Sequence, residues 1–255
     1  MSERVKIILD KNADILRLPA IALRGLVVFP GNIIHFEVGR KKSIAAIEWA
    51  MSNNNAVFLT AQQDMDVEDP GFKDLYAYGV VAEVKQVLRV SDELVKVLVE
   101  GKYRAKLLTL DSSGRFLLAS TKAAALRGTK SVDSARVEAL VRSVKEVFEE
   151  YLSLNPRLSK DVVYTIITNE DAALLCDYIP ANLLLKYTDK QALLNEGTVS
   201  GRLEKLLEIL RRETKILHIE KDIQSKVNEQ MDKNQRDYYL REQMRAISNE
   251  LDDFD

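Results

Sequence analysis

The segment from residue 199 to 251 constrains the fold of this 255-residue chain most, because it contains no proline and a single early glycine, Gly201. Charged residues of both signs make up roughly two-fifths of it. A narrow apolar seam runs between them, formed by Leu203, Leu206, Leu207, Leu210, Ile216, Ile219, Ile223, Val227 and Met231. The last steps of this seam are three, four, four and four residues, which predicts one long helix.

A continuous helix of about 49 residues is roughly 73 Å long at 1.5 Å per residue. Such a helix is longer than the preceding residues need to cover their own surface, so we expect it to project and to pair with another helix or a partner. The predicted assembly positions are Ile216, Ile219, Ile223 and Val227. Strict heptads are not sustained, so no long regular coiled coil is predicted, and a chain end that frays is the alternative reading.

Residues 15 to about 125 have the period of two that is typical of strands. The candidate strands are residues 33–38, 57–60, 80–90, 94–110 and 116–119. The two longest are joined by the polar residues 91–93, which predicts a β-hairpin. One helix interrupts the strands around Ile47, with Ser43 as its predicted cap and Asn53–Asn55 as its end.

Helical periodicity returns after a polar link at 128–134. The predicted helices are residues 137–152, ended by Pro156, then 162–167, then 172–179, capped by Asp171 and closed by Pro180. A capping box of Thr188 and Gln191 predicts the start of a fourth.

These patterns predict an α+β fold in three parts. Residues 1–125 form a β-rich lobe, either curved sheets or a partly open barrel, with one helix. Residues 126–198 form a helical bundle, and residues 199–255 form the long projecting helix.

Composition argues against several functions. The net charge of −2 does not favour nucleic acid or an anionic membrane, and no run approaches the roughly 18 apolar residues of a membrane helix. Cys176 is the only cysteine, which excludes an internal disulfide and fits the cytoplasm. With only His35 and His218 besides, and no phosphate-binding glycine loop, we predict no catalytic residue, no metal site and no cofactor in this chain.

Two groups of motifs resemble the N-terminal region of the ATP-dependent Lon proteases. The first comprises Leu23–Pro30, Phe36–Arg40, Ala61–Asp64, Leu75–Gly79 and Val99–Ala105. The second is Asn234–Ile247, which resembles the stretch that precedes the Lon ATPase module. Single motifs are weak evidence, whereas their shared order over nearly the whole chain is specific. Ala22 and His35 depart from the family by standing where many relatives have proline, which affects local strand geometry.

The resemblance implies an AAA+ ATPase module that binds ATP and Mg²⁺, followed by a Ser-Lys protease domain, neither of which is in this sequence. The chain is therefore interpreted as a fragment of a longer protein. The resemblance further implies a homohexamer in the cytoplasm, in which this region selects unfolded or damaged protein substrates.

Candidate substrate-binding residues follow from exposed apolar side chains. Tyr238, Tyr239 and Leu240 spread over about 200° of a helix, so at least one is expected to be exposed or to meet another subunit, and Met231 extends that surface. Packing against the ATPase module is the alternative. In the β lobe the candidates are Phe29, Pro30 and Phe72, for which core packing is the favoured alternative.

Three rival functions remain open at this point. The first is a stand-alone protein-binding adaptor, and the second is a nucleic-acid-binding β barrel, for which the basic run Gly101–Lys106 is the main signal. The third is a coiled-coil scaffold, in which the long helix is the purpose. Sequence beyond residue 255, salt-dependent binding of RNA or DNA, and the oligomeric state discriminate among them.

Overall fold

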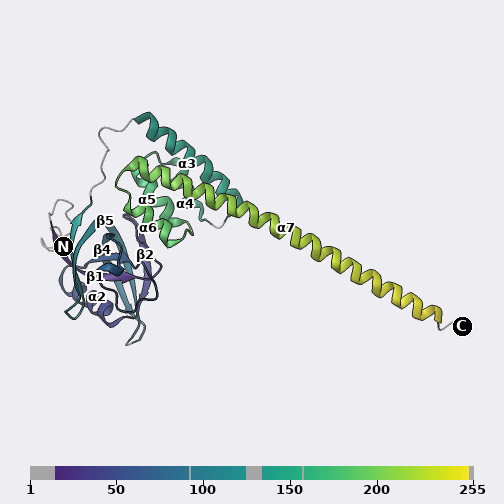
Figure 1. Ribbon diagram of the computed structural model, residues 1–255, viewed down its shortest axis with the longest axis horizontal. Helices are drawn as coiled ribbons and strands as arrows, with labels where there is room; N and C mark the ends of the chain where they lie inside the picture. The colour runs from purple at the N-terminus through teal and green to yellow at the C-terminus, as the bar shows by residue number, and fades with distance from the viewer. Residues whose placement is uncertain (1–14, 92, 125–133, 157, 253–255) are drawn as a thin grey trace. The chain divides into compact units, whose positions relative to one another are not determined.

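The computed structural model describes residues 15–91, 93–124, 134–156 and 158–252. In these ranges the strands precede the helices, with the exception of the helix α2, and the chain ends in one long helix (Figure 1). The predicted α+β class is thereby confirmed. The predicted polar link at 128–134 and the first domain boundary, at residue 125, lie almost entirely outside the described residues.

The six described strands form a sheet in the order β2-β5-β4-β3-β1-β6, and β6 also pairs with β5. Their bounds are β1 Leu16–Leu23, β2 Ile33–Val38, β3 Ala56–Ala61, β4 Tyr78–Arg89, β5 Val95–Asp111 and β6 Leu117–Ala123. The extra pairing closes five strands into a ring and leaves β2 attached outside it. The lobe is therefore a closed barrel rather than a partly open one.

The length of β5 makes this closure possible. Its first residues, from Val95 to Glu100, pair with β2, and its last residues, from Ala105 to Asp111, pair with β6. Register shifts next to Leu107 and Val84 mark β-bulges, which bend strands and increase their twist. The predicted hairpin of the two longest strands is present as the antiparallel pair β4–β5.

Strand β1 was not recognised in the sequence, because Pro19 lies in its middle. Proline has no N–H to donate, so it is normally kept out of central strands. Here the parallel ladder with β3 begins at Ala20, one residue later, while Pro19 faces Leu118 of β6. The proline therefore lies beyond the part of β1 that pairs on both sides.

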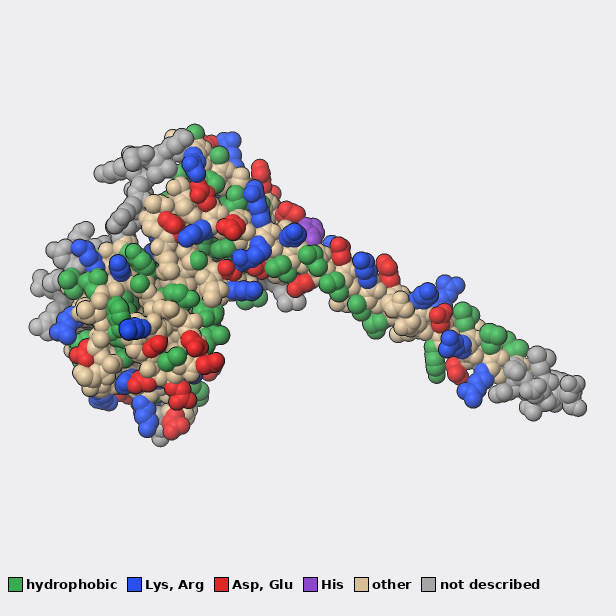
Figure 2. Space-filling view, viewed as in Figure 1, with side chains coloured by type: hydrophobic (Ala, Val, Ile, Leu, Met, Phe, Trp, Pro, Cys, Tyr) green, Lys and Arg blue, Asp and Glu red, His purple; other side chains and the backbone are tan. Residues whose placement is uncertain are grey.

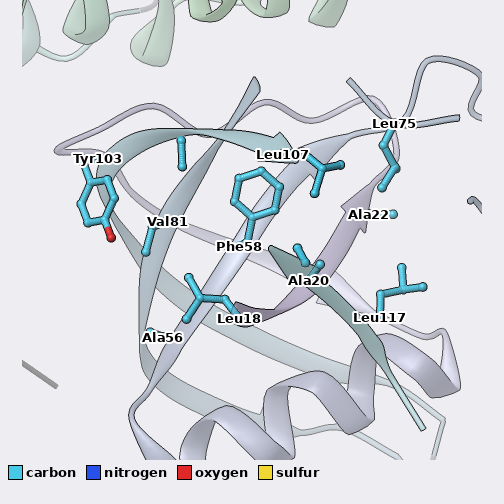
Figure 3. Packing of buried hydrophobic residues seen from close by; sticks show 12 residues of the cluster. Leu18, Ala20, Ala22, Ala56, Phe58, Leu75, Val81, Tyr103, Leu107 and Leu117 are labelled. Atoms are coloured by element: carbon cyan, nitrogen blue, oxygen red, sulfur yellow. The ribbon is translucent and has the colours of Figure 1, made fainter. Parts of the chain in front are cut away.

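The barrel interior is filled by alternate residues of its strands, with Phe58 at the centre (Figure 3). The buried cluster contains Leu18, Ala20, Ala22, Ala56, Phe58, Leu75, Val81, Tyr103, Ala105, Leu107, Leu117 and Ala119. Gly101 of β5 interrupts this alternation, since a Cβ there would lie 2.2 Å from the carbonyl oxygen of Phe29. The missing side chain lets the segment after residue 28 pass directly against the barrel.

Helix α2 (Lys41–Asn53) packs on the barrel through a face that includes Ala46 and Ala50, both fully buried. The predicted cap, Ser43, is wrong: the N-cap is Arg40, and Ser43 lies buried within the first turn. The predicted end is confirmed, because Asn54 is the C-cap and Asn55 adopts a left-handed φ of 56°.

Four helices follow the barrel: α3 Ser134–Leu154, α4 Lys160–Thr168, α5 Ala172–Asn182 and α6 Tyr187–Asn195. Asp171 caps α5 as predicted, by accepting hydrogen bonds from the amides of residues 173 and 174. Pro180 does not close α5 but lies inside its last turn. The predicted capping box is also wrong, because α6 begins one residue before Thr188 and Gln191 is fully buried, donating to Tyr78 O at 2.9 Å.

Helix α7 (Val199–Asp252) is continuous over 54 residues, which confirms the long C-terminal helix. The chain divides into two compact units, one of residues 1–145 and 158–209 and the other of 146–157 and 210–255. In the second unit the end of α3 lies beside α7, and His218 Nε2 is 3.0 Å from Glu150 Oε1. The domain bounds 1–125, 126–198 and 199–255 stay a prediction.

Candidate functional site

The outer stretch of α7 carries an uncovered apolar stripe. Every described side chain from residue 218 to 247 is exposed, and hydrophobic side chains recur along this stretch between charged ones (Figure 2). The stripe consists of Ile216, Ile219, Ile223, Val227 and Met231, which are 38% to 56% exposed. At 100° per residue these positions span an arc of about 120°, so the stripe is a single face of the helix.

Local interactions keep this stretch helical without tertiary cover. Gln224 donates to Asn228 at 3.0 Å, and Gln230 donates to Asn234 at 3.0 Å, both at the i,i+4 spacing that stabilises isolated helices. The absence of proline and of any glycine after Gly201 removes the residues that weaken a helix interior. Its apolar stripe can therefore stay exposed while the backbone stays ordered.

Tyr238, Tyr239 and Leu240 are all exposed, at 68%, 62% and 47%. Tyr238 continues the stripe at seven residues from Met231, whereas Tyr239 points elsewhere and its hydroxyl accepts a hydrogen bond from Gln243 at 2.9 Å. Leu240 begins a second apolar stripe with Met244 and Ile247, which the sequence reasoning missed. Their i, i+4, i+7 spacing was the available signal.

The three candidates of the β lobe have different surroundings. Phe29 is fully buried, as the favoured core alternative predicts, so its side chain is not part of an exposed surface. The reason is the turn that follows, in which Gly31 has a φ of 75° and its amide donates to Gly101 O at 2.8 Å, which fixes residue 29 against the barrel. Phe72, in the short helix η1 (Phe72–Asp74), is 47% exposed.

Pro30 is partly exposed and lines a cavity of about 680 Å³ between the barrel and the helices α5 and α7. A buried ion cluster forms part of its wall. Arg104 of β5 donates to Asp177 of α5, and Arg202 Nη1 of α7 lies 3.7 Å from the same carboxylate. Burial lowers the pKa of Arg104, although a guanidinium stays charged even so. Sequence reasoning missed Asp177 and Arg202, because isolated charges in helices usually face solvent.

Several of the motifs that carry the Lon resemblance meet in space. Arg40 donates to the backbone of Ala22 at 3.1 Å and to the side chain of Gln62. Gln62 is fully buried and in turn donates to Asp64 O at 3.1 Å and Val67 O at 2.9 Å. These contacts tie the loop after β3 to the barrel, so this part of the motif set builds the fold.

The single cysteine and the two histidines lie on three separate elements, α5, β2 and α7. Burial raises the pKa of the Cys176 thiol to about 12, and its side chain is fully buried. His35 lies on β2, while His218 pairs with Glu150 on α7. In the described ranges, no three His, Cys, Asp or Glu residues are grouped so that they could hold a metal ion. Nor does any helix of those ranges combine the length and apolar character needed to cross a bilayer.

A closed barrel followed by helices, the last of them long and amphipathic, defines an α+β protein. Residues 17–212 match the ATP-dependent protease La (LON) substrate-binding domain. The chain belongs to the Lon protease family.

Curated relatives support the same assignment. The chain is 39% identical to the Lon protease of Heliobacterium modesticaldum over 98% of its own length and 30% of that protein. It is 40% identical to the Lon protease of Brevibacillus choshinensis, over 93% of this chain and 30% of the relative. For the Lon protease of Escherichia coli K12 the identity is 38%, over 96% of this chain and 31% of that protein. The chain thus spans about a third of the length of these relatives.

Two solved structures share the fold. The N-terminal domain of Mycobacterium avium complex Lon protease superposes with a TM-score of 0.62 at 20% identity, covering 77% of this chain and 98% of that one. A Lon N-terminal domain protein from Xanthomonas campestris gives a TM-score of 0.53 at 15% identity, and the match covers 76% of this chain and 98% of that one.

Proposed function

We propose that this chain is the non-catalytic substrate-recognition and assembly region of an ATP-dependent protease, and that it binds unfolded or damaged polypeptides. The supporting observation is the apolar stripe of α7 in a chain of the Lon family. Unfolded proteins differ from native ones in the apolar surface that they expose. A helix that keeps isoleucine, valine and methionine in solvent offers a matching surface, and methionine adapts to varied partners.

Assembly is the second half of this proposal. A surface with modest affinity releases its clients, and several copies in a hexameric ring raise the effective concentration of binding sites. Bond cleavage belongs to a Ser-Lys protease domain, and nucleotide use belongs to an AAA+ module that binds ATP and Mg²⁺. The chain itself needs no cofactor for recognition, and its place is the cytoplasm.

The test compares two double variants of α7. Ile223→Gln with Val227→Gln makes the stripe polar, and Ser225→Gln with Gln235→Asn changes two exposed residues outside it. Fluorescence anisotropy with a labelled, permanently unfolded polypeptide measures binding to the full chain. We expect the stripe variant to bind about tenfold more weakly, which corresponds to about 1.4 kcal/mol. Equal affinity of both variants for the polypeptide would show that the stripe does not bind it.

Sedimentation of the same two variants tests assembly. If the stripe also pairs copies of this chain, the polar variant shifts to a smaller species than the control variant at equal concentration. A monomeric wild-type chain at all concentrations would restrict assembly to other modules. It would also remove the coiled-coil scaffold as a rival function.

A further inference from the structure

Lys106 and Lys122 form a cross-strand pair of like charges. They are direct register partners on the antiparallel strands β5 and β6, and both are exposed on the outer face of the barrel. Like charges in this arrangement destabilise a sheet. Neither lysine forms an ion pair with any residue that the structure describes, and Lys106 lies only over the ring of Tyr78, at 6.0 Å. Within the described residues the pair is therefore offset only by the contact of Lys106 with the Tyr78 ring and by no opposite charge.

Two buried arginines increase the positive charge behind this pair. Arg104 and Arg202 line the same cavity, of about 650 Å³, and share one carboxylate, Asp177. Arg104 Nε and Nη1 find no hydrogen-bond partner among the described residues, although the side chain is only 4% exposed. Glu196 is the one acidic residue of the cavity wall, and it already accepts hydrogen bonds from Thr198 at 3.0 and 3.1 Å.

Apolar side chains also line this cavity, and it adjoins the cavity lined by Pro30, called the Pro30 cavity below. Leu108 and Leu194 line it together with the four basic residues. Arg104, Ala123, Ala124 and Arg202 belong equally to the Pro30 cavity, so the two cavities adjoin. The Pro30 cavity is lined by Leu174, whose side chain is 39% exposed, and by Tyr178. Lys102, Asp171 and Asp177 line the Pro30 cavity too, and Asp177 is paired with Arg104. The two adjoining cavities, together called the groove, thus offer two lysines unpaired among the described residues at one end and, beside the charged groups of the Pro30 cavity, apolar side chains at the other.

We infer that this groove binds an extended acidic segment of a client polypeptide, with aspartate or glutamate side chains at Lys106 and Lys122 and apolar side chains beside Leu174. The inference rests on the proposed function and names a class of client for it. Charge complementarity and the length of the groove carry it, because a single small anion would leave the apolar end unused. This role explains the unfavourable lysine pair: the two like charges lower the stability of the fold, and they bind the acidic side chains of the client.

The experiment uses the full chain and three labelled probes. The first is an unstructured peptide of alternating glutamate and leucine, the second has lysine in place of each glutamate, and the third is a permanently unfolded polypeptide of zero net charge. The variant is Lys106→Gln with Lys122→Gln. Its matched control is Lys73→Gln with Lys160→Gln, which removes the same charge from two exposed positions outside the groove. Anisotropy measures affinity, and thermal unfolding measures stability.

We expect the groove variant to bind the acidic peptide about tenfold more weakly than wild type, while the control variant stays within about twofold. The affinity of the acidic peptide falls as salt rises, and the lysine peptide binds at least tenfold more weakly. The groove variant unfolds at the same temperature or a higher one, because the like-charge pair is gone. Loss of binding together with loss of stability would instead mean that the lysines support the fold, and it would overturn the inference.

Other outcomes separate the inference from the proposed function. If the neutral polypeptide binds and the acidic peptide does not, the groove assignment fails and the proposed function stands. If none of the probes binds, the proposed function fails as well. Tripolyphosphate is the competitor: if it binds tightly through Lys106 and Lys122 while the acidic peptide does not, the groove is a phosphate site and the polypeptide assignment is wrong.

Discussion

The longest strand and the longest helix of this protein use the same kinds of side chain in opposite ways. Val95, Val97 and Val99 of β5 are 0% to 3% exposed, whereas Ile223 and Val227 of α7 are 56% and 45% exposed. The strand is ordered by pairing with β2, which is distant in sequence, as well as with its hairpin partner β4, and the helix is ordered by hydrogen bonds within a few residues. Apolar residues in the barrel therefore specify the fold, while those on outer α7 are free to bind another chain.

The largest contrast is expected for truncation of an apolar side chain in each region. Phe58→Ala empties the centre of the barrel and should lower the free energy of unfolding by about 4 kcal/mol. Val227→Ala should change it by less than about 0.5 kcal/mol, since that side chain is 45% exposed. Urea unfolding followed by fluorescence of Trp49, the single tryptophan, reports on the barrel lobe. Similar losses for both variants would mean that outer α7 is part of the cooperative core.

A smaller loss of stability is expected at Gly101, where the backbone of β5 packs closely against the backbone of residue 29. Gly101→Ala places a methyl group 2.2 Å from Phe29 O, so the turn at residues 29–31 must move, at a cost of about 3 kcal/mol. Gly114→Ala is the control, because a Cβ there meets only ordinary contacts, at 3.7 Å. The same unfolding measurement distinguishes them. Wild-type stability in Gly101→Ala would show that the turn is not held against β5.

A residue with low helix propensity in outer α7 should lower the stability of that part of the helix and leave the stability of the barrel unchanged. Gln230→Gly removes an i,i+4 hydrogen bond and a helix-favouring residue, which costs that helix about 1 kcal/mol. Circular dichroism at 222 nm should decrease relative to Gln230→Ala, while the Trp49 transition keeps its midpoint. A shifted Trp49 midpoint would show that outer α7 and the barrel unfold together.

The smallest effect is expected from the surface charges of the barrel. Lys102 and Lys85 lie 2.6 and 2.8 Å from Glu100, and the hydrogen bond from Lys102 is the main cause that lowers the pKa of Glu100. A lowered carboxyl pKa adds stability above the ordinary carboxyl range, and that stability is lost as pH falls through the folded pKa. Glu100→Gln should therefore cost about 0.5 kcal/mol at pH 7.

This difference should shrink as pH falls below the ordinary carboxyl range, and it should disappear only below the lowered pKa of folded Glu100, where the carboxyl is protonated in both states. Unfolding curves at pH 7, 5 and 3.5 measure it, with Glu229→Gln on outer α7 as the control. A constant difference between Glu100→Gln and the wild type at all three pH values would contradict an ionic origin.

Local patterns were enough to predict much of this architecture. The alternation in β4 and β5, the aspartate cap of α5 and the glycine-poor, proline-free run of α7 each depend on neighbours in sequence. The stripe of α7 was predicted for the same reason, because its residues share a face through helix geometry alone. Its second stripe, with Met244 and Ile247, was equally readable and was overlooked.

Features that depend on distant contacts could not be read in this way. Core packing was the favoured reading for Phe29, but the close approach of Gly101 to its carbonyl oxygen could not be read from the sequence. β1 contains a proline, and only its pairing register shows why that is tolerated. The cationic groove joins Lys106, Lys122 and Arg202 from three elements, and no local pattern links them.

The sequence by itself determined most of the strands and helices, β1 excepted, and which face of α7 is apolar, because those properties arise within a few residues. Tertiary structure alone decided that the barrel closes through β5, that Gly101 packs against the carbonyl oxygen of Phe29 and that four basic side chains line one groove. The physical reason is that burial and charge proximity are properties of residues brought together from distant parts of the chain.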